Sequence, residues 1–211
     1  MMPFFKKILI LSPHTDDGEL GCGGTIAKFI EFGCEVFYVA FSSAEKSVPE
    51  GMPIDILKKE VKEATAVLGI PEKNLILFNF EVRNFSSVRQ SILELMIKLK
   101  RDINPDIIFL PSTCDTHQDH RTISEEGFRA FKTITMIGYE LPWNNLSFTT
   151  SCFITLEEKY LQKKIEALRC YKSQSFREYV SEEFIRSLAK TRGIQIGTKY
   201  AEAFEVIRCV I

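Results

Sequence analysis

The sequence predicts an α/β fold of the Rossmann-like type, with a mostly parallel sheet and helices on both of its faces. Apolar runs alternate with amphipathic stretches in the order βαβαβαβ, and the connections between them are short. The runs at 8–11 and 107–110 are continuously apolar, which is typical of strands buried on both faces. A helical and strand extension follows toward the C-terminus. We therefore expect a single domain over 1–211.

The first half of the chain supplies four expected strands and the three helices that connect them. Gly33 and Gly69 end two of these helices, since glycine readily takes the left-handed conformation found at helix C-termini. A polar stretch at 42–53 contains two prolines and a glycine, and indicates a loop. The expected strands are 8–11, 35–41, 75–80 and 107–110, and the expected helices are 25–32, 57–68 and 87–101.

The second half is predicted to add helices and the remaining strands. Thr122 and Glu125 resemble a capping box that opens a helix, and Thr155 with Glu158 resembles the start of another. Loose alternation of apolar and polar residues over 146–154 is typical of an edge strand. The other expected elements are a strand at 136–141, a helix at 181–191 and a returning strand at 199–211.

Composition and charge narrow the possible partners. The net charge is -1, so electrostatics give no reason to expect nucleic acid or an anionic membrane as a partner. No apolar run approaches the roughly 20 residues of a membrane helix, so we expect no membrane insertion. The N-terminal residues do not resemble a signal peptide. Six cysteines are scattered without a C-x-x-C pair, which is typical of free thiols in a cytoplasmic protein.

The three histidines of the chain fall in two loops. His14 follows the first strand together with Asp16 and Asp17, while His117 and His120 flank Asp119 after the fourth strand. In open α/β sheets, ligands bind outside the carboxyl ends of the strands. The topology therefore brings both loops to the same edge of the sheet, where we expect the functional site.

These residue types at this spacing indicate a metal centre. Two histidines and a carboxylate with an open fourth position are a common arrangement for catalytic zinc. A water bound to the metal needs a base, and an unligated carboxylate beside the ion is the candidate. Two adjacent aspartates cannot easily point at one ion, so one is expected as ligand and the other as base. Each loop by itself would be read as an ordinary capping or solvated loop.

The glycines at 21–24 also fit a different interpretation. A dinucleotide-binding G-x-G-x-x-G sequence would need glycine at position 26, where Ile26 stands, and acidic residues occupy the place of the phosphates. We therefore expect these glycines to permit close packing of the first helix against the sheet.

The motif Pro-His-Thr-Asp-Asp-Gly-Glu-Leu-Gly-Cys-Gly-Gly-Thr at 13–25, with His-Gln-Asp-His at 117–120, resembles the PIG-L/LmbE-like family of zinc-dependent N-acetylglucosaminyl de-N-acetylases. The segments 171–174 and 193–204 are similar to family segments as well, so the resemblance spans nearly the whole chain. It implies a Rossmann-like fold and an enzyme that removes acetyl groups from N-acetylglucosamine-type sugars.

The resemblance also implies a role for each site residue. The zinc ligands would be His14, Asp17 and His120, and another divalent metal could replace zinc. Asp16 would be the general base and would later protonate the leaving amine. The remaining two catalytic residues would be His117, which stabilises the oxyanion or acts as an acid, and Asp119, which orients or charges His117.

The sequence departs from the family pattern at positions that bear on the substrate. Thr15 replaces the usual proline and Gly18 the usual glutamate, and Glu19 is the candidate to stand in for the lost acid. Family members often carry an arginine in the second helix, where this chain has Lys58 and a second lysine beside it. Trp143 is a candidate to stack on a sugar ring, although it would equally serve as an anchor in a turn.

The sequence thus predicts a metal-dependent hydrolase that removes an acetyl group from an N-acetylated amino sugar or sugar conjugate, with zinc-bound water activated by Asp16. Its partner would be a small-molecule amino sugar, and a homo-oligomer is compatible with the sequence. The alternatives are a metal hydrolase acting on a non-sugar amide or an ester, and a catalytically inactive metal- or sugar-binding protein.

Overall fold

The computed structural model of the protein describes residues 5–210 and confirms the predicted α/β fold. Within these residues one sheet has the strand order β3-β2-β1-β4-β5-β7-β6. The strands from β3 to β5 are parallel, whereas β7 runs antiparallel to both β5 and β6. The strands are β1 (Lys7–Ser12), β2 (Glu35–Ala40), β3 (Leu75–Leu77), β4 (Ile107–Pro111), β5 (Thr135–Tyr139), β6 (Cys152–Leu156) and β7 (Tyr200–Arg208).

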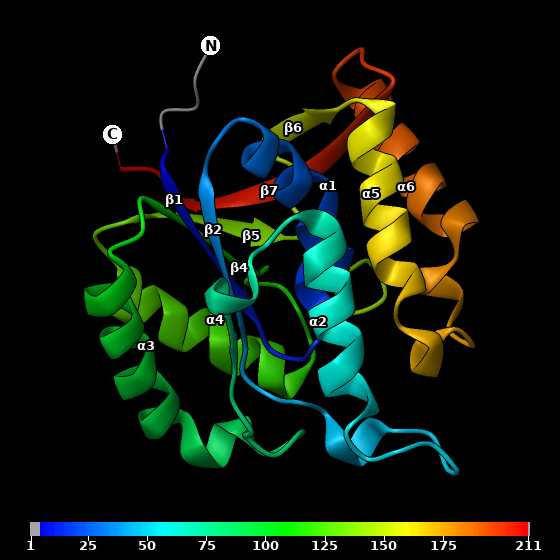
Figure 1. Ribbon diagram of the computed structural model, residues 1–211. Helices are drawn as coiled ribbons and strands as arrows, with labels where there is room; N and C mark the ends of the chain where they lie inside the picture. Colours follow the sequence, from blue (N-terminus) through cyan, green and yellow to red (C-terminus); the bar gives the residue numbers. More distant parts are fainter. Residues whose placement is uncertain (1–4, 211) are drawn as a thin grey trace.

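Helices cover both faces of the sheet (Figure 1). On one face α1 packs against α2 and α5, and α6 adjoins α5, while α3 and α4 pack together on the other face. The α-helices are α1 (Asp17–Glu31), α2 (Ile56–Leu68), α3 (Arg89–Ile103), α4 (Gln118–Phe131), α5 (Glu158–Arg169) and α6 (Glu182–Gln195). Short 3-10 helices are η1 (Glu45–Ser47), η2 (Glu72–Asn74), η3 (Phe85–Val88), η4 (Lys172–Gln174) and η5 (Glu178–Val180).

The central strand β1 explains why its sequence is continuously apolar. Ile8 and Ile10 contribute to the core beneath α1, α2 and α5, and Leu9 and Leu11 contribute to the core beneath α3 and α4. All four side chains are buried, because successive residues of a strand point to opposite faces and both faces are covered. The central position of β1, between β2 and β4, places its C-terminal end beside that of β4.

Helix α1 begins at Asp17 rather than at Thr25, so the predicted start of this helix was wrong. The glycine cluster lies inside the helix, where it allows close approach to the sheet. A Cβ at Gly21 would collide with the Tyr139 ring, and one at Gly24 would lie 2.6 Å from Leu156. The predicted use of these glycines for packing is therefore confirmed.

A buried ion pair supports α1 where the helix is interrupted. Cys22 has a non-helical φ of -146°, which leaves the N–H groups after it without partners in the preceding turn. The carboxylate of Glu202 accepts hydrogen bonds from the backbone N–H groups of Gly24 (3.1 Å) and Thr25 (2.7 Å). Lys164 Nζ lies 2.6 Å from the same carboxylate. Glu202 thus caps the second half of α1 and pairs with a buried ammonium group.

We expect Glu202→Ala to lower the free energy of unfolding by about 3–5 kcal/mol, because it leaves the buried Lys164 charge without a partner. Denaturant unfolding followed by circular dichroism measures this loss. The matched control is Glu157→Ala at an exposed glutamate, for which a change within about 0.5 kcal/mol is expected. Equal stability of the two variants would contradict the structural role of Glu202.

The start of α4 also differs from the prediction. The capping box expected at Thr122 is absent, because α4 begins at Gln118 and His117 is its N-cap residue. Thr122 instead lies within the helix, where its Oγ1 donates to the Gln118 carbonyl oxygen at 2.9 Å. This early start places Asp119 and His120 in the first turn of a helix, which fixes their directions.

Two strand predictions and one helix-cap prediction need smaller corrections. The edge strand is β6, so only the last part of the predicted 146–154 segment is extended, and Thr155 belongs to this strand instead of capping α5. Glu157 is the N-cap residue of α5. Strand β3 ends at Leu77, three residues before the predicted end, although Phe80 N–H still donates to the Phe41 carbonyl oxygen at 3.0 Å. The strand propensity of the residues alone does not indicate where the regular hydrogen bonding between β2 and β3 ends.

Two predictions from composition can be compared with the fold. No helix within residues 5–210 is long and apolar enough to cross a membrane. All six cysteines are free thiols, as their spacing predicted. The packed cores on the two faces of the sheet, without covalent cross-links, therefore hold this fold together.

Candidate active site

The two histidine loops meet at the carboxyl ends of β1 and β4, as the topology predicted. They line a cavity of about 240 Å³. Its wall also includes residues from the loop after β3, from the turn after β5 and from the segment between α5 and α6. Among the lining residues are His14, Asp16, Asp17, Arg83, His117, His120, Trp143, Asn144, Gln174, Arg177 and Tyr179.

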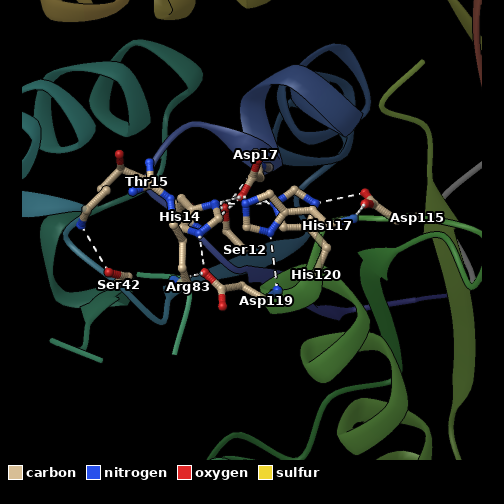
Figure 2. A network of polar contacts seen from close by, with 12 residues as sticks. Ser12, His14, Thr15, Asp17, Ser42, Arg83, Asp115, His117, Asp119 and His120 are labelled. Atoms are coloured by element: carbon tan, nitrogen blue, oxygen red, sulfur yellow. Dashed lines mark hydrogen bonds and ion pairs between the residues drawn. The ribbon is translucent and has the colours of Figure 1, made fainter. Parts of the chain in front are cut away.

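Three donor atoms converge at the base of this cavity. Asp17 Oδ2 lies 3.1 Å from His14 Nδ1 and 3.3 Å from His120 Nε2, and the two ring nitrogens are 3.2 Å apart. Figure 2 shows these three side chains turned toward one another. Ligand atoms held tetrahedrally at about 2.0–2.1 Å from a zinc ion lie about 3.3–3.4 Å from each other. The observed spacings are close to that geometry.

A buried carboxylate holds each of the two converging histidines from its far side. Asp119 Oδ2 lies 3.0 Å from His14 Nε2, and Asp115 Oδ2 lies 2.8 Å from His120 Nδ1. Both carboxylates are almost completely buried. In Figure 2 they lie on the outer sides of the group formed by His14, Asp17 and His120. Such carboxylate–histidine pairs fix the tautomer and the orientation of metal-ligating rings.

The protonation pattern of this cluster fits a cation. A carboxylate only accepts, so the proton of neutral His14 sits on Nε2 and that of neutral His120 on Nδ1. The unprotonated nitrogens, His14 Nδ1 and His120 Nε2, then direct their lone pairs toward Asp17 Oδ2, which has no proton to donate either. Three acceptors without a donor require a positive charge between them. The donor set of two imidazoles and one carboxylate suits zinc or another divalent metal of similar preference.

The pKa values of His120 and Asp17 also show that positive charge is favoured between these side chains. Burial disfavours the charged form of His120, but the charge of Asp17 and the hydrogen bond to Asp115 outweigh it and raise the pKa to about 10. Burial opposes ionisation of Asp17 too, yet the adjacent His120 and His14 hold the pKa of its carboxyl well below its ordinary value. In the absence of a metal, a proton therefore takes the position that suits a cation.

We expect Asp115→Asn to weaken metal binding by about 10- to 100-fold, because the amide no longer fixes the tautomer of His120. Competition with a chromophoric chelator measures the zinc affinity. Asp102→Asn, at an exposed aspartate near the end of α3, is the matched control and should bind zinc like the unchanged protein. An unchanged affinity in Asp115→Asn would show that His120 does not depend on this carboxylate.

His117 lies beside the cluster but is oriented differently. Its Nδ1 accepts a hydrogen bond from the backbone N–H of Asp119 at 3.2 Å. The neutral ring therefore carries its proton on Nε2, where it can donate. Burial together with the nearby His120 and His14 lowers the pKa of His117 to about 4. At neutral pH the ring is a hydrogen-bond donor without charge.

The carboxylate of Asp119 makes its hydrogen bonds to groups other than His117, while its charge acts on His117 by raising that ring's pKa. The carboxylate contacts His14, and it accepts hydrogen bonds from the backbone N–H groups of Arg83 (2.6 Å) and Phe85 (3.3 Å). The side chain points this way because Asp119 lies in the first turn of α4, beside the loops that follow β1 and β3. The side chain of Asp119 thus hydrogen-bonds His14, whereas its backbone N–H donates to His117 Nδ1.

Asp16 lines the same cavity and is not engaged in capping α1, although it occupies the N-cap position. Burial and the neighbouring charge of Asp17 raise its pKa to about 6, against the opposing effect of His14. Such a carboxyl is mostly ionised at neutral pH and accepts a proton more readily than an ordinary aspartate. These are properties of a general base.

Two of the three predicted substrate-binding residues lie away from the cavity lining. Glu19 is fully buried and accepts hydrogen bonds from the hydroxyl groups of Tyr38 and Tyr171. Lys58 Nζ forms an ion pair with Glu45 at 2.6 Å. The structure therefore does not bring these two side chains to the cavity that His14, Asp17 and His120 line.

The glycine at position 18 has a structural explanation. A Cβ at Gly18 would lie 2.5 Å from Tyr38 Cε2, so a larger residue would collide with this ring. The Tyr38 hydroxyl oxygen in turn accepts from the Gly18 N–H at 3.1 Å and donates to Glu19. Glycine at position 18, where the family usually has glutamate, thus leaves room for the Tyr38 ring that packs against this loop.

Trp143 does lie at the cavity. Its ring stacks on Tyr179 with centroids 4.0 Å apart and an interplanar angle of 9°, and Phe184 approaches at 6.0 Å. One face of the indole is therefore already covered by Tyr179. Stacking of Trp143 on a sugar stays a prediction, and the two rings together form one aromatic part of the cavity wall.

Several site residues were missed by the sequence reasoning. Asp115 precedes His120 by five positions in the loop after β4, and an acidic residue there was the available signal. Arg83, Arg177 and Tyr179 come from loops without periodic patterns. Nothing in their local sequence sets them apart from solvated loop residues.

Comparisons with known proteins identify the family of the chain. The model of the family PIG-L, described as GlcNAc-PI de-N-acetylase, matches residues 9–131. The chain is 31% identical over 174 residues to the uncharacterized deacetylase YaiS of Escherichia coli K12, covering 80% of this chain and 91% of that protein. It is 25% identical over 230 residues to the diacetylchitobiose deacetylase of Thermococcus kodakarensis, covering 96% and 83% respectively.

A solved structure shares the fold. The N,N'-diacetylchitobiose deacetylase from Pyrococcus horikoshii superposes with a TM-score of 0.77 at 23% identity, covering 97% of this chain and 84% of that one. The similarity includes the antiparallel C-terminal strands as well as the Rossmann-like half, since nearly the whole chain is covered.

Proposed function

The chain belongs to the PIG-L family, and from this membership we propose that it is a metal-dependent hydrolase that removes an acetyl group from an N-acetylated amino sugar or sugar conjugate. Relatives of the chain are deacetylases, and two of them are named for an acetylated sugar substrate. The observation that carries the proposal is the convergence of His14, Asp17 and His120 in a cavity that also holds Asp16.

The metal proposed for this site is zinc, held by His14 Nδ1, Asp17 Oδ2 and His120 Nε2. The two outer carboxylates support this ligand set, because they leave the correct ring nitrogens unprotonated. The ring of His117 also lies close by, and the donor nitrogens of all three histidines fall within 4.8 Å of one another. Asp17 is favoured over His117 as the third ligand because its oxygen is 3.1–3.3 Å from both other donors. Bound zinc would act as a Lewis acid on a carbonyl oxygen and lower the pKa of water.

Asp16 is proposed to move the proton. It would accept a proton from the attacking water as the oxygen adds to the acetyl carbonyl carbon. The same carboxyl would then return that proton to the amine nitrogen as the carbon–nitrogen bond breaks and acetate leaves. Its place in the cavity wall and its raised pKa support both steps.

His117 is proposed to stabilise the oxyanion. Its Nδ1 already accepts from a backbone N–H, so Nε2 is the donor that remains for the cavity. A neutral donor aimed at the oxygen that gains charge stabilises the tetrahedral intermediate. Of the two roles that the resemblance implied for His117, this one is favoured, because a ring that is neutral at pH 7 has no extra proton to give.

A catalytically inactive binding protein is the rival class, and it would be expected to have lost a ligand or the base. All of these groups are present, and the two ligating rings are held by buried carboxylates. Acetate release from matched N-acetylated and O-acetylated sugars tests the proposed bond. Release from the N-acetylated sugars is the expected result. Release from the esters alone would contradict the proposal.

A further inference from the structure

Two arginines line the cavity without an ion-pair partner. Within residues 5–210, neither Arg83 nor Arg177 lies within ion-pair distance of a carboxylate, although both belong to the cavity wall. Arg208, the other arginine with no ion pair to any of residues 5–210, lies over the Phe128 ring instead. The seven arginines that do form ion pairs are Arg89, Arg101, Arg121, Arg129, Arg169, Arg186 and Arg192.

Arg177 is held in place by the segment between α5 and α6. Its Nε donates to Gln174 Oε1 at 2.8 Å, and its guanidinium lies 5.5 Å from the centre of the Tyr179 ring. Gln174 is itself buried beside Ser173, whose backbone N–H and hydroxyl group both donate to Glu60 of α2. The guanidinium also hydrogen-bonds the Tyr179 side chain, and the remaining N–H groups of its terminal nitrogens are donors on a fixed group.

Arg83 is held by its backbone. It has a φ of 67°, in the left-handed region that a residue with a Cβ seldom adopts. Its N–H donates to Asp119 and its carbonyl oxygen accepts from Gln118, so the conformation is fixed from both sides. Such conformations persist where the surrounding structure requires them, and they gather at functional sites. The backbone of Arg83 is therefore held at the cavity wall, of which this residue is part.

Unpaired guanidinium groups in a cavity select for a charged ligand. A bound sugar displaces water from the wall, and a positive charge then loses hydration that a neutral hydroxyl group only partly replaces. A carboxylate or phosphate compensates for this lost hydration, since the planar guanidinium binds either group with two parallel hydrogen bonds. Asp16 is the carboxylate whose ionisation Arg177 favours, but the two do not form an ion pair.

We propose that the substrate carries an anionic group, a carboxylate or a phosphate, attached to the N-acetylated sugar, and that Arg177 binds it while Arg83 adds positive potential. This inference rests on the proposed function. It narrows the substrate class from amino sugars in general to acidic conjugates of them.

The test compares substrates that differ only in the charge of the group attached to the sugar. Suitable probes are methyl N-acetylglucosaminide, N-acetylglucosamine 1-phosphate and the carboxymethyl glycoside of N-acetylglucosamine. Acetate release gives kcat/KM for the unchanged protein, Arg177→Gln, Arg177→Lys and the control Arg169→Gln. Arg169 is a matched control because it lies at the end of α5, pairs with Glu182 on the surface and is not part of the cavity wall.

We expect the unchanged protein to prefer at least one anionic probe by about tenfold or more, and Arg177→Gln to lower kcat/KM for it by about 10- to 100-fold through KM. For the neutral probe the same variant should lower kcat/KM by a smaller factor, because only the effect of Arg177 on Asp16 is then lost. Arg177→Lys should retain part of the preference, because it keeps the charge but not the two-pronged geometry. The phosphate and carboxylate arms identify which anion is bound.

The outcomes separate the inference from the function on which it rests. Equal losses for neutral and anionic probes would show that Arg177 acts on Asp16 and not on the substrate, and would overturn the inference alone. A preference for the neutral probe would do the same. Absence of acetate release from every probe would overturn the proposed function, and the inference with it.

Discussion

Asp16→Asn is expected to lower kcat for acetate release by about 10²- to 10⁴-fold while the protein keeps its full complement of metal. The amide cannot accept the proton of the attacking water, and it has no proton to return to the leaving amine. Metal binding should persist because Asp16 is outside the group of three converging donors. Single-turnover kinetics and metal analysis on the same preparation measure both quantities.

The control for this variant is Asp102→Asn, which removes one exposed carboxylate that is not part of the cavity wall and should leave kcat unchanged. Full activity in Asp16→Asn would remove it from the role of base. Loss of the metal together with activity would instead move Asp16 into the ligand set. Either result would require a different assignment for the two adjacent aspartates.

His120→Ala is expected to abolish acetate release, because it removes one of the three proposed metal ligands. The zinc affinity should fall by more than about 100-fold, which exceeds the effect of losing an outer carboxylate such as Asp115. Equilibrium dialysis against zinc measures the loss. Because a ligand that binds only the folded state stabilises it, zinc should raise the melting temperature of the unchanged protein and not that of the variant.

Comparison with Asp16→Asn makes this prediction specific. The two variants should share a loss of turnover and differ in zinc content and in stabilisation by zinc. Stoichiometric zinc in His120→Ala would remove His120 from the ligand set and favour the group of His14, Asp17 and His117 in its place.

The sheet and its covering helices could be predicted because burial on two faces leaves a direct record in the sequence. The continuous apolar run of β1 and the glycine after α2 are examples. The start of α1 could not be predicted in this way. Its glycines lower helix propensity, and the interactions that offset this cost come from Glu202 and Tyr139, over a hundred residues away.

The same distinction applies to the site. His14, Asp17 and His120 could be grouped because parallel topology brings neighbouring strand ends together. The partner of Asp119 could not be predicted, since it depends on how the first turn of α4 faces β1. Arg177 reaches the cavity through the packing of the segment after α5, which carries no periodic pattern.

Stepwise reconstitution with zinc tests the central claim most directly. The protein is first freed of metal with a chelator, and acetate release from N-acetylated sugars is then followed as zinc is added. We predict no release from the metal-free protein and a linear gain that ends at one equivalent of zinc, with no gain in His120→Ala. Undiminished acetate release from the metal-free protein would contradict the account.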